Sequence, residues 1–374
     1  MELSFWGIQR IVKNAISCTL FLMSGPLVSI IMRSFNEAWA LRDTLAALKI
    51  QDCQSWELIV VDSGSSDGSV DLIRQANPRH FIQIRPEEYH PSRVMNRGME
   101  LASSEFGIFL NADATPQNSN WLRPLVSALQ EPQTAAVFGR QIPRADCRAV
   151  YAHDYERCFG ASRESAGWEH FFSMVSSGIR KDIWAKRGFL EKMQYSEDDE
   201  YTRWCRAQGY RIMYCPESVV MHSHNYTPEQ AYKRSFGEAK ALAAVWNGSR
   251  TQMNWPRTVL LGWLNDLRRD FSYCARTRRV SELPYAGRIR WSQRRARLAG
   301  FRAGWDFYRK EEPGPVVAGT IQLERGAHAA PRAMFRALAE PSTCPQAEPF
   351  GELQNQLLTS GDAGQHPRGG VCSS

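Results

Sequence analysis

From residue 27 to residue 139, short apolar runs alternate with segments whose apolar residues recur at helical spacing. An apolar run rich in Val and Ile is typical of a strand buried on both faces, and apolar residues at i, i+3 and i+4 mark one face of a helix. Strands that alternate with helices build a mostly parallel sheet covered by helices on both faces, so we predict an α/β fold. The pattern predicts strands at 27–32, 57–62, 80–84, 106–110 and 135–138 and helices at 38–48, 69–73, 91–102 and 121–129.

After residue 139 the pattern becomes irregular, and only separate elements stand out. Residues 196–200 open a helix that Gly209 ends, because glycine commonly follows the last turn of a helix. Residues 311–374 are rich in Gly, Ala, Pro, Gln and Ser with weak periodicity, so we expect a disordered tail there. The other expected elements are a strand leading into a helix at 178–184, strands at 210–214 and 218–221, a helix at 229–245 and amphipathic helices within 255–310.

Residues 1–25 carry an apolar pattern of their own. Apolar positions between Ile8 and Met23 follow helical spacing, while Arg10 and Lys13 fall elsewhere on the helical wheel. This pattern predicts an amphipathic leader, and the alternative is a cleaved signal peptide, since two basic residues precede an apolar run. No stretch of the sequence reaches the roughly 18 uninterrupted apolar residues of a spanning helix, which argues against a polytopic membrane protein.

Polar side chains stand where three of the predicted strands end. Asn36 follows the first strand, Asp62 ends the second, and Asp113 follows the fourth. The carboxyl ends of parallel strands meet at one edge of a sheet, where α/β proteins bind their ligands. We therefore expect these three side chains to lie close together and to form part of a site.

Five segments carry motifs in a fixed order: 26–37, 60–69, the helix with Asn96 and Gly98, 109–116 with Leu-Asn-Ala-Asp-Ala-Thr-Pro, and 195–199 with Tyr-Ser-Glu-Asp-Asp. In this order they resemble glycosyltransferase family 2, an inverting family with the GT-A fold. The Leu-Asn-x-Asp-Ala-x-Pro motif is similar to that of bacterial rhamnosyltransferase-like members. The resemblance implies a GT-A catalytic domain over residues 26–245.

A nucleotide-sugar transferase must hold a base, a ribose, a diphosphate and a hexose. Asp62 can accept a hydrogen bond from a pyrimidine N–H or a ribose hydroxyl, and Asn36 with Glu37 can complete that pocket. The structural alternatives are that Asn36 only caps a helix and that Asp62 only begins a turn, and for Asp67 a turn role is favoured. Together with the resemblance, this predicts donor-nucleotide contacts at Phe35, Asn36, Glu37, Asp62, Asn96, Asn111 and Ala112.

The metal motif of the family is Asp-x-Asp, and this sequence departs from it with Asn-Ala-Asp at 111–113. Asn111 keeps an oxygen but loses a charge, so Asp113 is the carboxylate left to hold Mg²⁺ or Mn²⁺. His222 is the second predicted ligand, and its imidazole would favour Mn²⁺. For His222 and His224 the alternative is a hydrogen-bonded structural histidine. The predicted cofactor is a divalent metal, whose charge offsets the charge that builds on the departing diphosphate.

The acids Glu197, Asp198 and Asp199 stand at the start of a predicted helix. In an inverting transfer one carboxylate must deprotonate the acceptor hydroxyl as that hydroxyl attacks the anomeric carbon. The resemblance assigns this role to Asp198, with Glu197 as its catalytic neighbour, and the adjacent charges would raise the pKa of Asp198. The alternative is an acidic first turn that complements the helix dipole.

The net charge of +7 becomes informative once it is divided along the chain. Residues 1–254 carry 28 basic and 28 acidic side chains, whereas residues 255–310 carry 13 Arg, one Lys and only four acids. We therefore predict a basic helical extension at 246–310. Its Trp and Phe residues, interleaved with Arg, leave three uses open: docking on an anionic membrane surface, a structural or oligomer-forming subdomain and, least favoured, nucleic-acid binding.

Nine cysteines are scattered along the chain without a C-x-x-C motif, and their number is odd. This pattern argues against a disulfide framework or a cysteine-based zinc site. Reduced thiols are typical of the cytoplasm, so we expect a cytoplasmic protein, peripheral at the inner face of the plasma membrane where a lipid-linked acceptor would lie.

Together these observations predict an inverting glycosyltransferase that acts in cell-envelope polysaccharide biosynthesis. The expected donor is a nucleotide-diphospho-sugar, either dTDP-rhamnose or a UDP-sugar, and the expected acceptor is a saccharide or a lipid-linked saccharide. An inactive nucleotide-sugar-binding scaffold is the alternative that Asn111 suggests, and the Glu197–Asp198 pair argues against it. A nucleic-acid-binding protein is the third hypothesis, and we expect no nucleic-acid partner.

Overall fold

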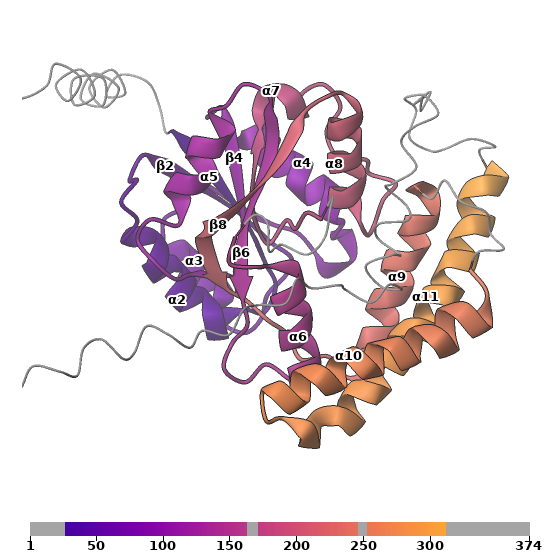
Figure 1. Ribbon diagram of the computed structural model, residues 1–374. Helices are drawn as coiled ribbons and strands as arrows, with labels where there is room; N and C mark the ends of the chain where they lie inside the picture. The colour runs from indigo at the N-terminus through magenta and orange to yellow at the C-terminus, as the bar shows by residue number, and fades with distance from the viewer. Residues whose placement is uncertain (1–26, 163–170, 246–252, 312–374) are drawn as a thin grey trace, which may run out of the picture. The chain divides into compact units, whose positions relative to one another are not determined.

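The computed structural model describes residues 27–162, 171–245 and 253–311, and an eight-stranded sheet runs through them (Figure 1). The strands stand side by side in the order β3, β2, β1, β4, β7, β6, β8, β5. Their bounds are β1 Val28–Ser34, β2 Trp56–Asp62, β3 His80–Gln83, β4 Phe106–Asn111, β5 Thr115–Pro116, β6 Thr134–Ile142, β7 Ser176–Arg180 and β8 Arg211–Met221. The predicted leader at 1–25 and, apart from Glu311, the predicted tail at 311–374 lie outside the described residues.

The sheet is mostly parallel, as predicted, but it is mixed. β1 pairs in parallel with β2 and β4, β2 with β3, and β6 with β8. β7 runs antiparallel to β4 and β6, which the sequence does not reveal because an apolar run does not encode the direction of its strand. The two strands predicted at 210–214 and 218–221 are one strand, β8, whose pairing with β6 is irregular between Cys215 and Val219.

Successive residues of a central strand point to opposite faces, so β1 contributes to two hydrophobic cores. Ile30 and Met32 pack with Leu41 on one face, whereas Ile31 packs with Met95 on the other. Two layers of helices therefore cover the sheet, which confirms the predicted α/β arrangement. The first face carries α2 (Ala38–Lys49), α3 (Ser69–Gln75) and α5 (Leu122–Leu129), and the second carries α4 (Pro91–Leu101), α7 (Lys181–Trp184) and α8 (Glu197–Ala207).

Gly98 allows α4 to lie close to the sheet. A Cβ atom added at this position would stand 2.4 Å from Cγ2 of Ile31, so no side chain fits without moving the helix. The glycine that accompanies Asn96 in the sequence motif thus has a packing reason.

The sequence pattern does not predict α6 (Ala149–Cys158). Polar residues interrupt its apolar spacing, so the helix has no clear amphipathic stripe. It is held by tertiary packing, because Val150 and Tyr151 share a buried cluster with Ile289 near the C-terminal end of the described chain.

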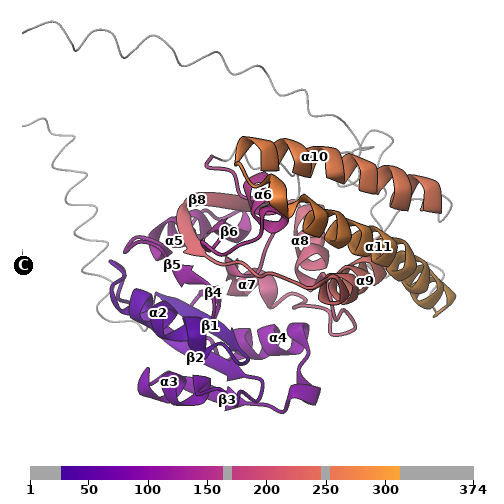
Figure 2. The same ribbon diagram turned by 90° about the horizontal axis from the view of Figure 1, so that it is seen from below.

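A group of helices follows β8 and contains the predicted basic extension. Its members are α9 (Pro228–Val245), the π-helix η4 (Pro256–Leu261), α10 (Gly262–Arg276), the short 3-10 helix η5 (Val280–Glu282) and α11 (Leu283–Glu311). α9 and α11 lie side by side (Figure 2), and Gly300 of α11 faces the backbone of α9, where a Cβ would stand 2.2 Å from the carbonyl oxygen of Phe236. α9 belongs to the predicted catalytic domain, yet it packs on α11 of the predicted extension. The domain boundary between residues 245 and 246 therefore stays a prediction.

Two arginines of the extension lie in its interior. Arg290 donates to Asp270 of α10 at 2.8 Å and to Asp154 of α6 at 2.8 Å. Arg294 donates to Asp266 of α10 at 2.6 Å. These arginines and the acids of α10 are buried, so part of the basic charge counted in the sequence joins helices together and does not face solvent. Among the described helices, none combines the length and the hydropathy needed to cross a bilayer.

We predict that Asp270→Ala lowers the free energy of unfolding by about 3–5 kcal/mol, because it removes one partner of a buried ion pair and leaves Arg290 undercompensated. Asp71→Ala is the matched control: Asp71 and Arg74 are exposed and 3.9 Å apart, so its loss should stay below about 1 kcal/mol. Urea denaturation followed by circular dichroism measures both. A loss at Asp270 no larger than that at Asp71 would contradict the role of the buried pair.

Candidate active site

The carboxyl ends of β1, β2 and β4 align at one edge of the sheet. Arg33 of β1 pairs with Asn111 of β4, and Asp62 is the last residue of β2, opposite the last residue of β1. Asn36 and Asp113 follow directly on β1 and β4. The predicted gathering of polar side chains at this edge is therefore confirmed.

The loops that follow β1 and β2 are bonded to each other. The backbone N–H of Asn36 donates to the Ser65 hydroxyl at 2.9 Å, and the side-chain oxygen of Asn36 accepts from the Ser66 N–H at 2.8 Å. Asn36 has a φ of 55° and does not cap α2, so that structural alternative is wrong. The helix begins at Ala38, whose N–H donates to the Asp67 carboxylate of the other loop at 2.9 Å. This bond agrees with the structural role favoured for Asp67.

Asp62 is fully buried beneath this pair of loops. Its carboxylate accepts from the N–H groups of Gly64 at 3.1 Å and Ser65 at 3.0 Å and from the Ser65 hydroxyl. These bonds hold the turn after β2, so the turn role of Asp62 is real. A contact between Asp62 and the donor stays a prediction.

The other residues predicted to contact the donor differ in their surroundings. Phe35 is 49% exposed and Ala112 is fully buried, with its N–H donating to the Arg33 carbonyl at 3.1 Å. Glu37 is half-buried, and burial followed by the nearby Asp113 carboxylate raises the pKa of Glu37 to about 8. The contacts predicted between the donor and these three residues stay predictions.

Asn96 has a structural role in this fold. Its amide nitrogen donates to the Phe189 carbonyl at 2.9 Å, and its amide oxygen accepts from Trp184 Nε1 at 3.0 Å and from the Phe189 N–H at 2.9 Å. These bonds use both polar atoms and join α4 to the segment after α7. The geometry therefore does not support the predicted contact between Asn96 and the donor.

Arg33 is a fixed positive charge at the middle of the site. Its Nη2 donates to the side-chain oxygen of Asn111 at 2.9 Å, and its charge acts on Glu37, Glu197 and Asp198. Burial alone would lower the pKa of the Arg33 guanidinium, but the acidic groups around it outweigh burial and raise it. Arg33 therefore links the end of β4 with the start of α8.

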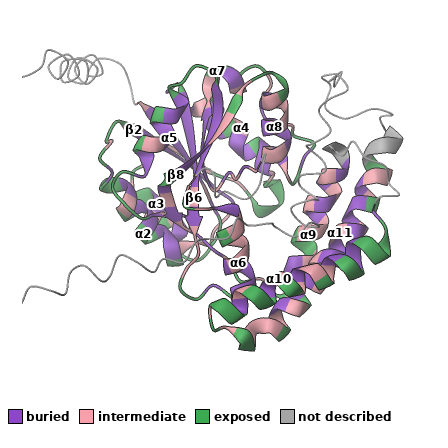
Figure 3. Cartoon of the chain, in the orientation of Figure 1, coloured by how far each residue is buried: buried purple, intermediate pink, exposed green. Residues whose placement is uncertain are grey.

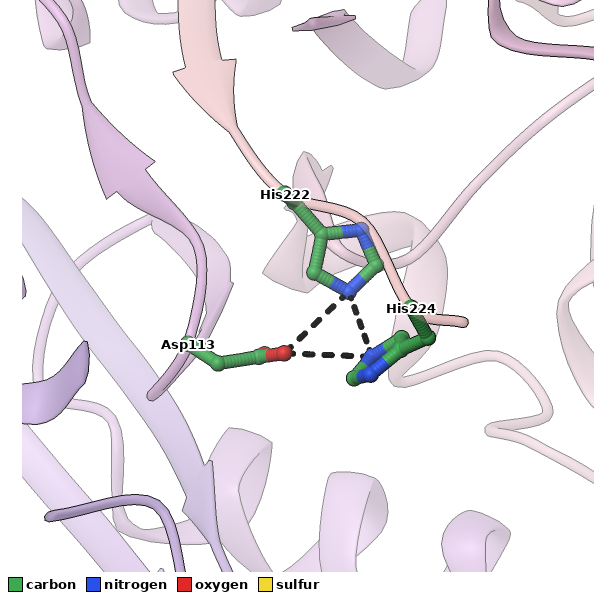
Figure 4. A group of neighbouring side chains, drawn as sticks. All are labelled: Asp113, His222 and His224. Atoms are coloured by element: carbon green, nitrogen blue, oxygen red, sulfur yellow. Dashed lines mark hydrogen bonds and ion pairs between the residues drawn. The ribbon is translucent and has the colours of Figure 1, made fainter. Parts of the chain in front are cut away.

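Asp113, His222 and His224 point toward one another (Figure 4). Oδ2 of Asp113 lies 3.1 Å from Nε2 of His224 and 3.5 Å from Nε2 of His222, and the two imidazole nitrogens are 3.1 Å apart. One carboxylate oxygen and two imidazole nitrogens facing a common point form a donor set suited to Mn²⁺ or a similar ion. The sequence predicted Asp113 and His222 as ligands, which stays a prediction, and the structure places His224 beside them.

Two neighbours orient the ring of His222. Its Nδ1 lies 2.9 Å from the amide oxygen of Gln141 and 3.0 Å from the hydroxyl of Tyr155. Because an amide oxygen can only accept, Nδ1 carries the proton and the lone pair of Nε2 faces Asp113. Burial lowers the pKa of His222 to about 4, so the ring is neutral near pH 7, as a metal ligand must be.

The carboxylate of Asp113 also fits a cation. It is 1% exposed, and within the described residues neither of its oxygens accepts an aligned hydrogen bond. Burial alone would raise the pKa of Asp113, but the two imidazoles and Arg144 outweigh burial and lower it, so the group stays ionised. A buried, ionised carboxylate beside a neutral imidazole is costly unless a cation compensates it, so these residues fit a divalent metal.

Four consecutive acids open α8, and the structure divides them into two pairs. The last two are compensated: Asp199 accepts from Arg203 at 2.7 Å, and Glu200 accepts from Arg187 at 2.8 Å. Within the described residues, no ion pair of this kind reaches the first two. A first turn that only complements the helix dipole would not need to leave half of its acids uncompensated.

Glu197 and Asp198 are this uncompensated pair. Burial raises the pKa of both carboxyls, and the charges of Glu197 and Asp199 add to the effect on Asp198, whose pKa reaches about 7. Arg33 opposes the shift at both residues without cancelling it. A carboxylate whose pKa lies near 7 is suited to remove a proton at neutral pH.

Two arginines that were not predicted as site residues also belong here. Arg144 donates to the Asp113 carbonyl at 2.6 Å, and its guanidinium lies 4.6 Å from the centre of the Trp39 ring. Arg234 of α9 acts electrostatically on Glu197 and on His222. The His-x-His spacing at 222–224 was a signal for the third ligand, whereas Arg144 lies in the irregular region and carries no local signal.

Known proteins resemble this chain over the same range. Residues 29–211 match the family described as Glycosyl transferase family 2. The chain is 30% identical over 223 residues to the O-antigen chain rhamnosyltransferase WbaN of Salmonella anatum, a match that covers 56% of this chain and 70% of that protein. It is 30% identical over 222 residues to the O-antigen chain rhamnosyltransferase RfbN of Salmonella typhimurium, with the same coverage of both chains.

The fold also has a counterpart among solved structures. The mannosyltransferase PcManGT from Pyrobaculum calidifontis, solved in complex with GDP-Man and Mn²⁺, superposes with a TM-score of 0.51 at 18% identity, over 76% of this chain and 88% of that one. This likeness confirms the predicted GT-A-like fold. Taken with the family match and the two relatives, it leads to one conclusion: the chain belongs to glycosyltransferase family 2.

Proposed function

We propose that this protein transfers a sugar, with inversion, from a nucleotide-diphospho-sugar to a saccharide acceptor in the biosynthesis of cell-envelope polysaccharide. Membership of the family supports nucleotide-sugar transfer. The two relatives named as O-antigen rhamnosyltransferases support dTDP-rhamnose as the first donor to test, ahead of a UDP-sugar. The observation that carries the proposal is the uncompensated carboxylate of Asp198 beside Arg33, at the same sheet edge as Asp113.

The donor would lie over the loops after β1 and β2. The exposed ring of Phe35 offers a stacking face for the base, Glu37 follows it in the same loop, and the buried Asp62 holds the turn of the neighbouring loop. Arg33, held by Asn111, places a positive charge near the diphosphate. A divalent cation held by Asp113, His222 and His224 supplies further positive charge to the leaving group when it is bound.

Asp198 is the proposed general base. Its carboxylate takes the proton of the acceptor hydroxyl while that oxygen attacks the anomeric carbon from the face opposite the diphosphate. The bond between the anomeric carbon and the diphosphate oxygen breaks, and the nucleoside diphosphate leaves with the electron pair. Burial and then the charges of Glu197 and Asp199 hold the pKa of Asp198 at about 7, so near neutral pH a substantial fraction of the base is ionised and still basic enough to accept a proton.

We also propose that the reaction takes place in the cytoplasm, at the inner face of the membrane when the acceptor is lipid-linked. None of the six described cysteines forms a disulfide, which supports a reducing compartment.

The inactive scaffold is the less favoured alternative. It rests on Asn111, which lacks the charge of the family's first metal-motif Asp. Asn111 has a role of its own, since it accepts from Arg33, and two imidazoles face Asp113. A scaffold also gives no reason to bury the uncompensated pair of Glu197 and Asp198.

The base assignment is tested with Asp198→Asn. The amide cannot accept the proton, so transfer from dTDP-rhamnose and donor hydrolysis should fall by about 10²–10⁴-fold, with little change in donor affinity. Asp199→Asn is the matched control, since Arg203 already compensates that neighbour, and it should keep most of the activity. Turnover of radiolabelled donor measures both. If Asp198→Asn keeps its activity, Asp198 is not the general base. If the wild type binds the donor without turnover, the inactive-scaffold alternative is favoured.

The pH dependence follows from the raised pKa of Asp198, which is about 7. The base works only when it is ionised, so kcat/KM should rise about tenfold per pH unit below 7 and level off above it. In Asp199→Asn the midpoint should move to lower pH, because the charge of Asp199 helps to raise the pKa of Asp198. A flat profile between pH 5 and pH 8, or a midpoint that Asp199→Asn leaves in place, would contradict the assignment.

The metal site is tested with His224→Ala. Loss of one of three protein ligands should raise the Mn²⁺ concentration for half-maximal activity by more than about tenfold, and EDTA should abolish activity that Mn²⁺ then restores. His80→Ala, on the edge strand β3, is the control and should leave the Mn²⁺ dependence unchanged. Full activity in EDTA would show that catalysis does not require a metal held by Asp113, His222 and His224.

A further inference from the structure

One face of the η4–α10 segment exposes large apolar side chains to solvent. Exposed stretches recur along α10 (Figure 3). Leu261 is 59% exposed, Leu264 48% and Phe271 56%, and Leu260 lies beside them. Their spacing of three to four residues puts them on one side of the helix, together with Arg268. We define this stripe as the α10 outer face: Leu260, Leu261, Leu264, Arg268 and Phe271.

The opposite side of α10 is the charged one. Asp266 and Asp270 point into the protein, where they pair with Arg294 at 2.6 Å and Arg290 at 2.8 Å. A surface helix normally buries its apolar side and exposes its charges, whereas α10 buries its two acids and exposes Leu264 and Phe271. The exposed apolar stripe is therefore typical of a surface that binds an apolar partner.

The charge on this surface is positive. Asp266 and Asp270 are the only acids between residues 256 and 276, and both are buried. Arg257 and Arg268 are exposed along the outer face. The exposed carboxylate that α10 does contact, Glu156 of α6, is held by Arg276 at 2.6 Å. A partner must therefore offer apolar groups and negative charge together, and a second copy of the same face would bring arginine against arginine.

Most tryptophans of the basic segment are not part of this surface. Trp263 and Trp291 pack edge to face between α10 and α11 at 5.4 Å, and Trp263 Nε1 donates to the Gly287 carbonyl at 3.0 Å. Trp255, just before η4, is 48% exposed. It continues the apolar stripe with a ring whose N–H can stay hydrated, as tryptophans at a lipid–water boundary do.

We propose that the α10 outer face docks on an anionic lipid bilayer, with the helix lying in the plane of the membrane. Its leucines and Phe271 enter the boundary between headgroups and acyl chains, and Arg257 and Arg268 contact anionic headgroups. The geometry is that of an interfacial helix and not of a spanning one, in line with the absence of a membrane-crossing helix among the described residues.

The docked helix lies one helix away from the active site. α6 contacts α10 and α11 through Glu156 and Asp154, and its Tyr155 bonds to His222 at 3.0 Å. Docking would thus hold the site close to the membrane, where a lipid-linked acceptor is found. The link between docking and a lipid-linked acceptor rests on the proposed function. Binding to a bilayer is measured without any nucleotide sugar.

Vesicle flotation with the full chain tests the proposal. The wild type should bind phosphatidylcholine vesicles that contain one third phosphatidylglycerol at least about tenfold better than pure phosphatidylcholine vesicles, and salt should weaken the binding. The triple variant Leu261→Ser, Leu264→Ser, Phe271→Ser should lower the partition coefficient by about tenfold or more. Its control is Ile50→Ser, an apolar residue that is 66% exposed on α2 and should leave binding unchanged.

Arg268→Glu separates charge from apolar contact. It should lower binding to the anionic vesicles by about tenfold and leave binding to pure phosphatidylcholine unchanged, whereas Lys49→Glu, an exposed charge reversal at the end of α2, should change neither. Thermal melting by circular dichroism shows that each variant is folded, and solution donor hydrolysis should stay at the wild-type level. If hydrolysis is absent from the wild type but docking holds, the proposed function fails and the docking surface stands.

Several results would overturn the docking surface. The first is a wild-type protein that does not float with vesicles, or that binds anionic and pure phosphatidylcholine vesicles equally well. The second is a triple variant that binds like Ile50→Ser. A dimer in gel filtration that Leu261→Ser dissociates, without vesicle binding, would make the face a self-association surface, and salt-sensitive polynucleotide binding in place of vesicle binding would make it a nucleic-acid surface.

Discussion

The parallel register of β1, β2 and β4 is the constraint on which the site depends. It sets Arg33 beside Asn111 and brings the end of β2, Asp62, to the same edge. From that edge Arg33 reaches the acids at the start of α8, and Asp113 reaches the histidines that follow β8. A change of register by one residue would turn the side chains of the shifted strand to the other face of the sheet and would disrupt this edge.

Charge compensation distinguishes structural groups from functional ones in this protein. Asp270 and Glu200 are buried acids, and each is bonded to an arginine at 2.8 Å. Among the described residues, no arginine is bonded to the carboxylates of Asp198 and Asp113: Asp198 accepts from the N–H of Asp199 at 2.8 Å, and Asp113 faces two imidazoles. Their environment moves their pKa values in opposite directions. This difference fits the roles proposed above, Asp198 as the base and Asp113 as a metal ligand.

The sequence predicted what depends on local pattern. The strands that are buried on both faces, most helices, and the gathering of Asp62 and Asp113 at one edge followed from apolar periodicity and from the parallel-sheet rule, and family motifs pointed to Asp198 and His222. It did not reveal α6, whose helical state depends on packing, or Arg144, which reaches the site through tertiary contacts. It also could not show that the acids of α10 face inward, because composition does not say which side of a helix is buried.

The central claim is that this sheet edge holds a cation on one carboxylate and two imidazoles. The most direct measurement is pulsed electron paramagnetic resonance of Mn²⁺ bound to the protein in the presence of nucleoside diphosphate, with ¹⁵N-labelled histidine. The account predicts hyperfine coupling to two imidazole nitrogens, one of which disappears in His224→Ala and the other in His222→Ala. Coupling to phosphate and water alone, with no histidine nitrogen, would contradict it.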